Sequence, residues 1–409
     1  MSFSKLKLSD KLNISLKENE YTTPTAIQEK VIPLVLEHKD IMAKAQTGSG
    51  KTASFVLPIL NLWANKRYEG KAKIRCLVLT PTRELALQVS QAFNTFSKYL
   101  QKKPKVVSVI GGESIGEQLL DIQKGCDVVV ATTGRLLDIL KKKQINLSTL
   151  EFLVLDEADK MLDFGFEEEL ELLLDSLPKK RQNLLFSATY PPKILTIASK
   201  ITQDAIEVSI ESEKTTVETI NQRVIEVNKE NRSALLRTLI KDEKWDQVLV
   251  FMASKRSCDN LAFKFRKYGF EAESFHGDLI QEERNETLED FKNKKIKVLF
   301  ATDIAARGLH IDNISCVVNF DLPRAVADYI HRIGRTGRAG KSGVAVSFIC
   351  HEDKEHFSLI EKRSDIKLTR EQIAGFELTG KPIEKTKGQA PIKGKRKSKK
   401  DKLREQSSK

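Results

Sequence analysis

A glycine-rich stretch decides the fold of this chain: Ala45-Gln46-Thr47-Gly48-Ser49-Gly50-Lys51-Thr52. A short apolar segment at 41–43 precedes it, and apolar residues at helical spacing follow it. Strand, glycine turn and helix in this order are the context of a phosphate-binding loop. The glycines let backbone N–H groups turn toward an anion, and the start of the following helix adds partial positive charge. We therefore predict nucleotide binding along the whole stretch; the alternative is a strand-to-helix turn rich in small residues.

The end of this stretch carries the groups expected to contact the phosphates. Lys51 is predicted to reach the outer phosphates, and the Thr52 hydroxyl is predicted to bind a magnesium ion. The general pattern of such loops starts with glycine, whereas this chain has Ala45 at that position.

The composition is that of a folded chain with a highly charged surface. The 409 residues suffice for two domains, 40% of them are hydrophobic, and 31% are charged, against about a quarter in typical domains. The net charge is +13, but residues 381–409 hold twelve Lys or Arg against three acids, a net of +9. Most of the basic excess therefore belongs to the C-terminal end.

The sequence predicts a soluble, cytosolic protein. Its five cysteines are scattered without metal-ligand or disulfide spacing, so we expect buried free thiols. Residues 1–12 hold no apolar core of signal-peptide length. No apolar run approaches the length of about 18 residues that a membrane-spanning helix needs.

Short apolar, β-rich segments recur along the chain, and each is followed by a turn and a helical pattern. Such segments lack polar alternation, which is typical of strands buried on both faces of a sheet. Strands that alternate with helices predict parallel βαβ units with right-handed crossovers. The predicted strands are 41–43, 74–79, 106–110, 127–131, 152–155 and 183–186, then 223–227, 248–253, 298–301, 316–320 and 344–349.

This order of elements occurs twice, with a polar break between the two halves. The sequence thus predicts an α/β fold of two similar lobes at 1–208 and 220–375, with an interdomain linker at 209–219. Residues 376–409 are rich in Lys, Gly and Ser and poor in large apolar side chains. Such a composition cannot offset the entropy of ordering, so we predict a disordered basic tail there.

An acidic pair follows the apolar segment 152–155. Asp156 and Glu157 would lie at the carboxyl end of this strand, the edge where open α/β sheets bind ligands. Asp156 can hold magnesium there, and Glu157 can orient and deprotonate the attacking water. An acidic pair alone is more often solvated surface, but the buried strand and the upstream phosphate loop favour the functional interpretation.

Together, the stretch at 45–52 and Asp156-Glu157-Ala158-Asp159 resemble the motifs of DEAD-box RNA helicases, a family of helicase superfamily 2. The other motifs of this family follow in order between residues 3 and 349. The resemblance implies two tandem RecA-like domains, RNA-stimulated ATP hydrolysis, and ATP and Mg²⁺ as cofactors.

Two further first-half motifs resemble those of the family. The stretch from Tyr21 to Gln28 is similar to the adenine-binding Q motif, which implies that the Gln28 amide reads the adenine edge and that Tyr21 stacks on the base. Without this context, Gln28 would be interpreted as a surface residue. Ser187-Ala188-Thr189 resembles the motif that couples hydrolysis to strand separation, and a hydroxyl there could equally cap a helix.

The second half resembles the family at an arginine-rich motif, His331-Arg332-Ile333-Gly334-Arg335-Thr336-Gly337-Arg338. Arg335 and Arg338 are three positions apart and suit the charge of a triphosphate. The resemblance makes them arginine fingers supplied to ATP on the first lobe, and it implies a coupling role for His331. The alternative is an exposed basic turn.

The stretch from Thr302 to His310 resembles motif V, which bridges ATP and RNA in this family. The resemblance places Gly308 at the nucleotide and gives Asp303 a coupling role. The family normally has Asp, expected at the ATP ribose, where this chain has His310.

The expected RNA contacts are polar loops rather than lysine runs. Backbone N–H groups, hydroxyls and one arginine per loop suit phosphate and 2′-OH contacts that do not read sequence. The predicted RNA-binding residues are Pro81, Thr82, Arg83, Gly112, Thr132, Gly134, Arg135 and Thr302, with 254–256 continuing the track. The basic tail is a second, salt-sensitive tether for RNA or, alternatively, a solvated tail that serves solubility.

The leading interpretation is an ATP-dependent RNA helicase whose two lobes close on ATP and single-stranded RNA. The expected catalytic residues are Lys51, Thr52, Asp156, Glu157, Arg335 and Arg338. We expect a bacterial-type monomer without membrane contact that acts on ribosomal RNA or with RNA-decay machinery. The alternatives are an ATP-gated RNA clamp with little unwinding, which carries the same motifs, and a translocating DNA helicase.

Overall fold

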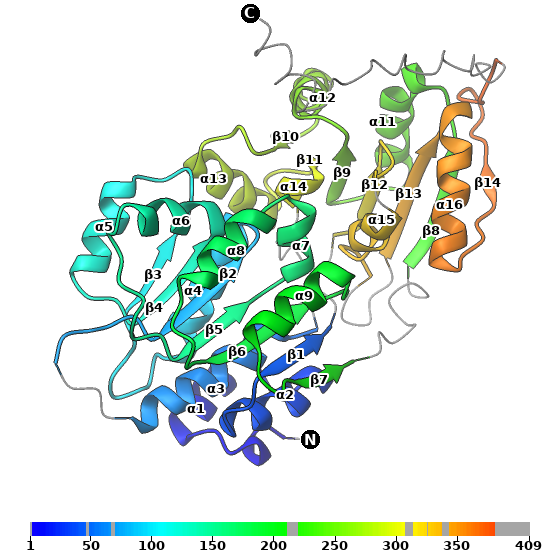
Figure 1. Cartoon of the computed structure of the whole chain (residues 1–409). Helices are drawn as coiled ribbons and strands as arrows, with labels where there is room; N and C mark the ends of the chain where they lie inside the picture. The colour runs from blue at the N-terminus through cyan, green and yellow to red at the C-terminus, as the bar shows by residue number, and fades with distance from the viewer. Residues whose placement is uncertain are drawn as a thin grey trace, which may run out of the picture.

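The computed structural model describes residues 2–45, 49–66, 70–210, 220–306, 314–324, 326–337 and 343–380. Within them the chain forms two lobes, each built on a seven-stranded sheet with flanking helices (Figure 1). The predicted α/β fold of two similar lobes is therefore confirmed.

The first sheet is entirely parallel, as the alternation of strands and helices predicts. Its strand order is β3-β4-β2-β5-β6-β1-β7. The strands are β1 (Ile41–Lys44), β2 (Cys76–Thr80), β3 (Val106–Val109), β4 (Val128–Thr132), β5 (Phe152–Leu155), β6 (Gln182–Ser187) and β7 (Ile206–Ser209).

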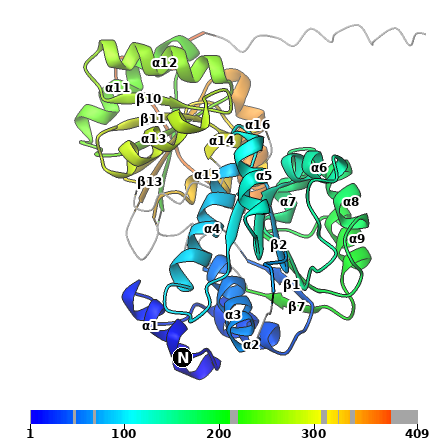
Figure 2. The same cartoon turned by 90° about the vertical axis from the view of Figure 1, so that its left-hand side faces the viewer.

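Helices cover both faces of this sheet (Figure 2). They are η1 (Phe3–Leu6), α1 (Asp10–Glu18), α2 (Ala26–Leu36), α3 (Lys51–Asn65), α4 (Arg83–Phe96), α5 (Ile115–Gln123), α6 (Thr133–Lys141), α7 (Ala158–Asp163), α8 (Glu167–Asp175) and α9 (Pro192–Ile201). Side chains of α2, α3 and α4 share one apolar cluster with the sheet, and those of α6, α8 and α9 share the other.

Strand β5 shows why the predicted strands lack polar alternation. Val154 packs in the cluster that includes α3, whereas Leu153 and Leu155 pack in the opposite cluster. Because successive side chains of a strand point to opposite faces, a strand covered by helices on both sides needs apolar residues at every position.

The second sheet repeats the topology of the first. Its order is β10-β11-β9-β12-β13-β8-β14, which is the same order when the strands are counted within each lobe. The strands are β8 (Ile220–Glu226), β9 (Val248–Met252), β10 (Ala272–Phe275), β11 (Val298–Thr302), β12 (Cys316–Asn319), β13 (Gly343–Ile349) and β14 (Arg370–Glu371). All of their pairings are parallel.

The helices of the second lobe again pack on both faces of the sheet. They are η2 (Lys229–Asn231), α11 (Arg232–Asp242), α12 (Lys255–Lys267), α13 (Gln281–Lys292), α14 (Asp303–Ala306), α15 (Val326–Ile333), η3 (His351–Asp353) and α16 (Lys354–Ser364).

Three strands escaped the sequence analysis: β7, β10 and β14. All three lie at edges of their sheets, where one side of the strand has no neighbour. Edge strands are only half covered and tolerate polar residues such as Glu207 and Glu273, so they lack the continuous apolar pattern that marks a central strand.

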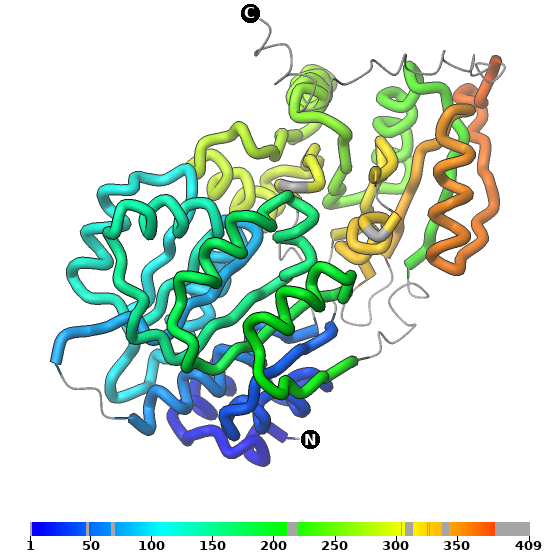
Figure 3. Tube along the Cα trace, viewed as in Figure 1, coloured from blue at the N-terminus to red at the C-terminus, as the bar shows by residue number. Residues whose placement is uncertain are grey.

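The predicted boundaries differ from the structure in two places. Ser209, the first residue of the predicted linker, ends β7, and the Ile210 N–H donates to the Lys44 carbonyl at 3.0 Å. Phe376 packs against the core of the second lobe and Thr379 bonds to Asn228, so described contacts continue past the predicted start of the tail. Residues 211–219 and 381–409 lie outside the described residues. The described chain ends on the second lobe, far from the N-terminus (Figure 3).

All five cysteines are buried and unpaired, which confirms the prediction of free thiols. Among the helices of the described residues, none is both long enough and apolar enough to cross a bilayer.

We predict that Phe186→Ala lowers the free energy of unfolding by about 3–5 kcal/mol, because it opens a cavity in a packed core. Phe186 on β6 is fully buried, and its ring centroid lies 5.2 Å from that of Phe55 on α3. Urea unfolding measures the change. Leu172→Ala on the exposed face of α8 is the control and should change the midpoint little. Equal effects of the two variants would contradict this account of the core.

Candidate functional site

The predicted nucleotide residues gather at the carboxyl ends of neighbouring strands in the first sheet. Strands β5, β6 and β1 are neighbours, and because they are parallel their carboxyl ends lie together. These ends lead into the glycine-rich stretch, the acidic pair and Ser187-Ala188-Thr189. Three stretches far apart in the sequence therefore meet at one place.

The described part of the glycine-rich stretch has the backbone conformation of an anion-binding site at the N-terminus of a helix. Gly50 takes a φ of 94°, a left-handed conformation that suits glycine, and is the N-cap of α3. Lys51 is buried at the start of the helix, and its Nζ donates to the Ala45 carbonyl at 3.1 Å. The ammonium group is thus folded back over the loop. Ser49 and Thr52 are only partly buried.

Several predicted site residues lie outside the described residues. They are Gln46, Thr47 and Gly48 of the glycine-rich stretch, Gly308 and His310 of motif V, and Arg338.

Gln28 on α2 lies against the glycine-rich stretch. Its Nε2 donates to the Gly50 carbonyl at 3.1 Å, and its Oε1 accepts from the Thr25 N–H at 3.0 Å. A Cβ at position 50 would sit only 2.5 Å from the Gln28 amide nitrogen, so glycine is needed there for space as well as for its φ. Gln28 is 2% exposed, and it therefore links the Q motif to the loop instead of lying on the surface.

Tyr21 belongs to an aromatic group at the same end of the lobe. Its ring meets Phe96 edge-on at a centroid distance of 5.3 Å and lies 6.5 Å from Phe3. Tyr21 is 39% exposed, so solvent reaches part of the side chain.

Asp156 is a buried acid without a partner for one of its oxygens. It is 1% exposed, and its Oδ1 has no hydrogen-bond partner among the described residues. Burial raises the pKa of this carboxyl to about 7, opposed by the nearby Lys51 ammonium and reinforced by Glu157. A cation beside this oxygen would favour the ionised form of the carboxyl.

Glu157 has a strained backbone. Its φ of 52° is left-handed, which is uncommon for a residue with a side chain and costs about 1–3 kcal/mol. The residue is the N-cap of α7 and is buried. The turn from β5 into α7 thus positions the two acids side by side at the strand end.

Asp159 connects the acidic motif to Ser187 and Thr189. Its N–H donates to Ser187 Oγ at 3.2 Å, and its Oδ2 accepts from Thr189 Oγ1 at 3.0 Å. Ser187 Oγ in turn donates to the Thr189 carbonyl at 2.7 Å. Asp159, to which the sequence analysis gave no role, therefore links two of the predicted coupling residues, Ser187 and Thr189.

The second lobe faces this network through α15. Lys160 Nζ lies 3.0 Å from Asp163 on its own lobe and 3.6 Å from Asp328 on α15. Burial, helped by Lys160, lowers the pKa of His331 to about 4, while Asp159 opposes the shift. His331 is therefore neutral near pH 7. Arg335 is buried on the same side.

Arg332 holds the second-lobe motifs together. Its guanidinium pairs with both oxygens of Asp303 at 2.6 and 2.7 Å, donates to Asn319 Oδ1 at 3.0 Å, and lies over the Phe251 ring at 4.8 Å. Asp303, predicted to couple the sites, is thus tied directly to the arginine-rich motif.

A buried ion pair between α4 and α13 also joins the two lobes. Arg284 on α13 donates to Glu84 on α4, with Nε and Nη2 at 2.7 and 2.5 Å from Oε1. The same guanidinium donates to the His276 carbonyl at 2.7 Å and lies over the Phe275 ring at 4.5 Å. Both charged side chains are only 5% exposed. Such a pair has little access to water and fixes the relative position of the lobes.

The predicted RNA residues of the first lobe lie beyond β2, β3 and β4, the other half of the same sheet edge. A Cβ at Gly112 would lie 2.0 Å from Arg83 Nη1, so the two loops touch. Arg135 donates to the Glu113 carbonyl at 3.1 Å and to Gln118 at 3.2 Å. Thr82 caps α4, and Pro81 before it is buried. Thr132 precedes α6, and a Cβ at Gly134 would have no atom within 4 Å.

The second lobe repeats this division. Thr302 ends β11 and Ser254 follows β9, and both strands lie in the β10-β11-β9 half of that sheet. The structure thus brings the predicted RNA residues to one half of each sheet edge and the nucleotide residues of the first lobe to the other.

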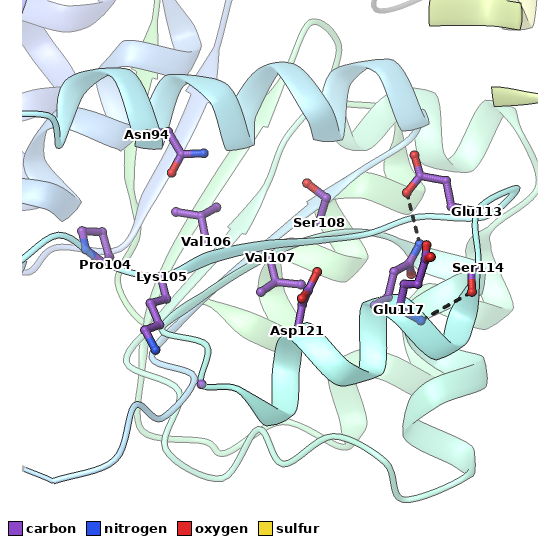
Figure 4. Close-up of a pocket in the computed structure, with 12 residues that line it drawn as sticks. Asn94, Pro104, Lys105, Val106, Val107, Ser108, Glu113, Ser114, Glu117 and Asp121 are labelled. Carbon is purple, nitrogen blue, oxygen red and sulfur yellow. Dashed lines mark hydrogen bonds between the residues drawn. The ribbon is translucent and has the colours of Figure 1, made fainter. Parts of the chain in front are cut away.

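A polar cavity of about 530 Å³ lies beside edge strand β3, between α4 and α5 (Figure 4). Its walls include Lys105, Ser108, Glu117 and Asp121. None of the predicted nucleotide residues lines it, so it is separate from the site at β1, β5 and β6. Among the described residues there is also no cluster of three His, Cys, Asp or Glu side chains able to hold a metal.

The sequence analysis assigned no individual role to Glu84, Asp159, Lys160, Asp328 or Arg332, although Glu84 lies within the candidate RNA-contact loop at 81–85. Asp159 and Arg332 belong to stretches that it did identify, so the motif itself was the available signal. Lys160 and Asp328 carry no signal, because their contact joins residues far apart in the sequence.

Two family models match the chain. Residues 25–197 match the DEAD/DEAH box helicase model, and residues 230–340 match the helicase conserved C-terminal domain.

Curated relatives match across both lobes. A probable ATP-dependent RNA helicase, ddx3 of Dictyostelium discoideum, is 41% identical over 369 residues, which are 86% of this chain and 51% of that protein. The DEAD-box ATP-dependent RNA helicase CshA of Bacillus licheniformis is 39% identical over 370 residues, which are 90% of this chain and 75% of that protein.

Among solved structures, S. cerevisiae Dbp5 bound to RNA and ADP BeF3 has a TM-score of 0.81 and 32% identity. The match covers 91% of this chain and 95% of that chain. A variant of the same yeast protein bound to Nup159, Gle1, IP6 and ADP has a TM-score of 0.61. The present arrangement of the lobes is therefore closer to that of the RNA-bound yeast protein.

We predict that Asp156→Asn changes how stability depends on pH in magnesium-free, nucleotide-free buffer. The folded-state pKa of about 7 lies above the ordinary 3.8, so wild-type stability falls as pH rises through this window. The shift corresponds to roughly 4 kcal/mol of unfolding free energy that the wild type loses as pH rises and that the Asn variant, which has no carboxyl there, does not lose. Denaturant unfolding between pH 4 and pH 8 measures this difference. A constant gap between the two proteins would contradict the assignment.

Proposed function

The chain belongs to the DEAD/DEAH-box helicase family, and we propose that it is an ATP-dependent RNA helicase that remodels RNA duplexes and RNA–protein complexes. One observation carries the proposal furthest. The acidic motif of one lobe faces α15 and His331 of the other, while the polar loops follow the neighbouring group of strands in both sheets. The relatives named as RNA helicases support RNA over DNA.

ATP binding is proposed for the stretch at 45–52, with the base near Tyr21 and Gln28. The Lys51 ammonium, which folds over the loop, would move to the outer phosphates, where two negative charges compete well with a carbonyl. Binding of the base to Gln28 would affect Gly50 directly, because the Gln28 amide donates a hydrogen bond to the Gly50 carbonyl. Base recognition and the phosphate loop are thereby joined in one contact.

Magnesium fits the residues that the family implies for it. Asp156 has an unpartnered, buried carboxylate oxygen whose pKa is raised by burial, and a cation would satisfy it. Asp156 and Thr52 are the residues proposed to hold the magnesium ion. When bound, the ion would neutralise charge on the phosphates.

Hydrolysis is proposed to depend on Glu157 and on arginines of the second lobe. Glu157 would orient and deprotonate the attacking water from its strained position at the strand end. Arg335, together with Arg338, would stabilise charge that develops on the phosphates. Since the arginines come from the other lobe, hydrolysis would require the lobes to be together.

Coupling to RNA is proposed to follow two connections. On the nucleotide side, Asp159 bonds Ser187 and Thr189, and Lys160 contacts Asp328. On the RNA side, Glu84 next to Arg83 pairs with Arg284. RNA and ATP would therefore each favour the same closed arrangement and tighten the binding of the other. Ribosomal RNA and the RNA-decay machinery remain the predicted partners in the cell.

We predict that Glu157→Gln lowers RNA-stimulated ATP turnover by about 10²–10⁴-fold while ATP binding persists, because the amide cannot accept the proton of the water. Phosphate release with saturating RNA measures turnover, and a fluorescent ATP analogue measures binding. Glu168→Gln, an exposed acid on α8, is the control and should retain turnover. Wild-type turnover in the Glu157 variant would remove it from the proposed mechanism.

We predict that Glu84→Gln raises the RNA concentration needed for half-maximal ATPase by about 10²–10⁴-fold. Removing one partner strands a buried charge and costs about 3–5 kcal/mol in the closed arrangement. Glu84→Gln combined with Arg284→Gln should recover part of the loss, since no single charge remains buried. Lys98→Gln, which removes an exposed ion pair with Glu18, is the control and should behave like wild type. If the single and double variants lose equally, the pair does not join the lobes during catalysis.

A further inference from the structure

Helix α12 carries exposed aromatic side chains that neither the core nor the nucleotide site uses. Phe263 is 55% exposed and Tyr268, just after the helix, is 54% exposed. Helix α12 lies at the top of the second lobe in Figures 1 and 2. The opposite face of the helix packs into the lobe through Cys258, Ala262 and Phe265.

Each exposed ring has a cation on its face. Lys267 Nζ lies 4.4 Å from the centroid of Phe263, and the Arg237 guanidinium of α11 lies 3.9 Å from the centroid of Tyr268. Lys264 is exposed. It lies between the two rings, because residues three or four positions apart, here 267 and 268, are its neighbours on the helix surface. Arg237, Phe263, Lys264, Lys267 and Tyr268 therefore form one continuous region, the α12 surface.

The charge of the α12 surface is uncompensated within the part of the chain that the structure describes. Arg237, Lys264 and Lys267 form no ion pair with a described residue. Two acids on neighbouring segments have partners of their own: Asp259 accepts from Ser274 and contacts His276, and Glu273 pairs with Arg266. Leu120 and Leu172, two other exposed apolar side chains, lie on acidic helices.

The α12 surface lies one helix length from the proposed RNA track. Helix α12 begins directly after Ser254, its side-chain cap, at the carboxyl end of β9. Its thirteen residues span about 20 Å, so the aromatic end lies within reach of an RNA strand that leaves the cleft at Ser254.

We propose that the α12 surface is an auxiliary binding site for the single-stranded RNA flank outside the cleft. The inference rests on the proposed RNA-helicase function. Exposed aromatic side chains can stack on unpaired bases, and the adjacent cations attract the backbone phosphates. A single-stranded flank fits better than a duplex, whose bases keep their faces covered. The site holds RNA without reading its sequence and keeps the substrate on the protein when the cleft opens.

The test compares two RNAs on the full chain in the presence of a non-hydrolysable ATP analogue. One RNA of about 8 nucleotides fills only the cleft, and one of about 25 adds a single-stranded flank. The variant is Phe263→Ala with Lys267→Glu. The matched control is Leu359→Ala with Lys362→Glu, an exposed apolar and basic pair on α16 of the same lobe.

The variant should lose affinity for the longer RNA on the order of tenfold, and its salt dependence should become flatter. Its affinity for the shorter RNA and the ATPase rate stimulated by that RNA should match wild type, as should everything measured for the control. Wild-type affinity of the variant for both RNAs would overturn the proposal and point to an acidic protein as the partner.

Photo-crosslinking provides a second measurement. An RNA with 4-thiouridine only in its flank should crosslink to the segment that contains Phe263 and Tyr268, whereas crosslinks confined to the cleft loops would overturn the proposal. If RNA of neither length stimulates the wild-type ATPase, the proposed function fails, and this inference fails with it.

Discussion

Parallel strand pairing is the constraint on which the rest of the structure depends. Because every strand of a sheet runs the same way, each lobe has a single edge where all carboxyl ends meet. The strand order then divides this edge in the first lobe. The neighbours β5, β6 and β1 lead into the phosphate and acidic stretches, and β3, β4 and β2 lead into the polar loops. The proposed nucleotide and RNA sites thus share one scaffold.

The nucleotide half of this edge is built from locally unfavourable features. Asp156 is a buried acid with an unpartnered oxygen, and Glu157 adopts a left-handed backbone. Neither would persist unless the packed strands and helices around them stabilised the fold by more than these features cost. Gly50 shows the opposite solution, since glycine accepts both the φ of 94° and the close approach of Gln28. The buried Glu84–Arg284 pair then connects the scaffold of one lobe to that of the other.

The sequence predicted the central strands well because each is covered on both faces and therefore uniformly apolar. It did not predict β7, β10 and β14, whose edge positions tolerate polar residues. Within the candidate site, the stretches at 45–52, 156–159 and 187–189 were recognisable, since each follows a strand and carries chemistry typical of its role. The contact of Lys160 with Asp328 was not, because an ordinary ion pair has no pattern in the sequence.

The sequence alone determined the residue types for phosphate binding, acid–base chemistry and phosphate contacts, since local spacing is enough to place a loop or an acid at a strand end. It also determined that two similar lobes exist. The tertiary structure decided which of these groups meet: Gln28 against Gly50, Asp159 with Thr189, and Glu84 with Arg284. It also decided that α12 leaves Phe263 and Tyr268 uncovered. The physical reason is that hydrogen bonds, ion pairs and burial depend on distances in space, and packing sets those distances between residues far apart in the chain.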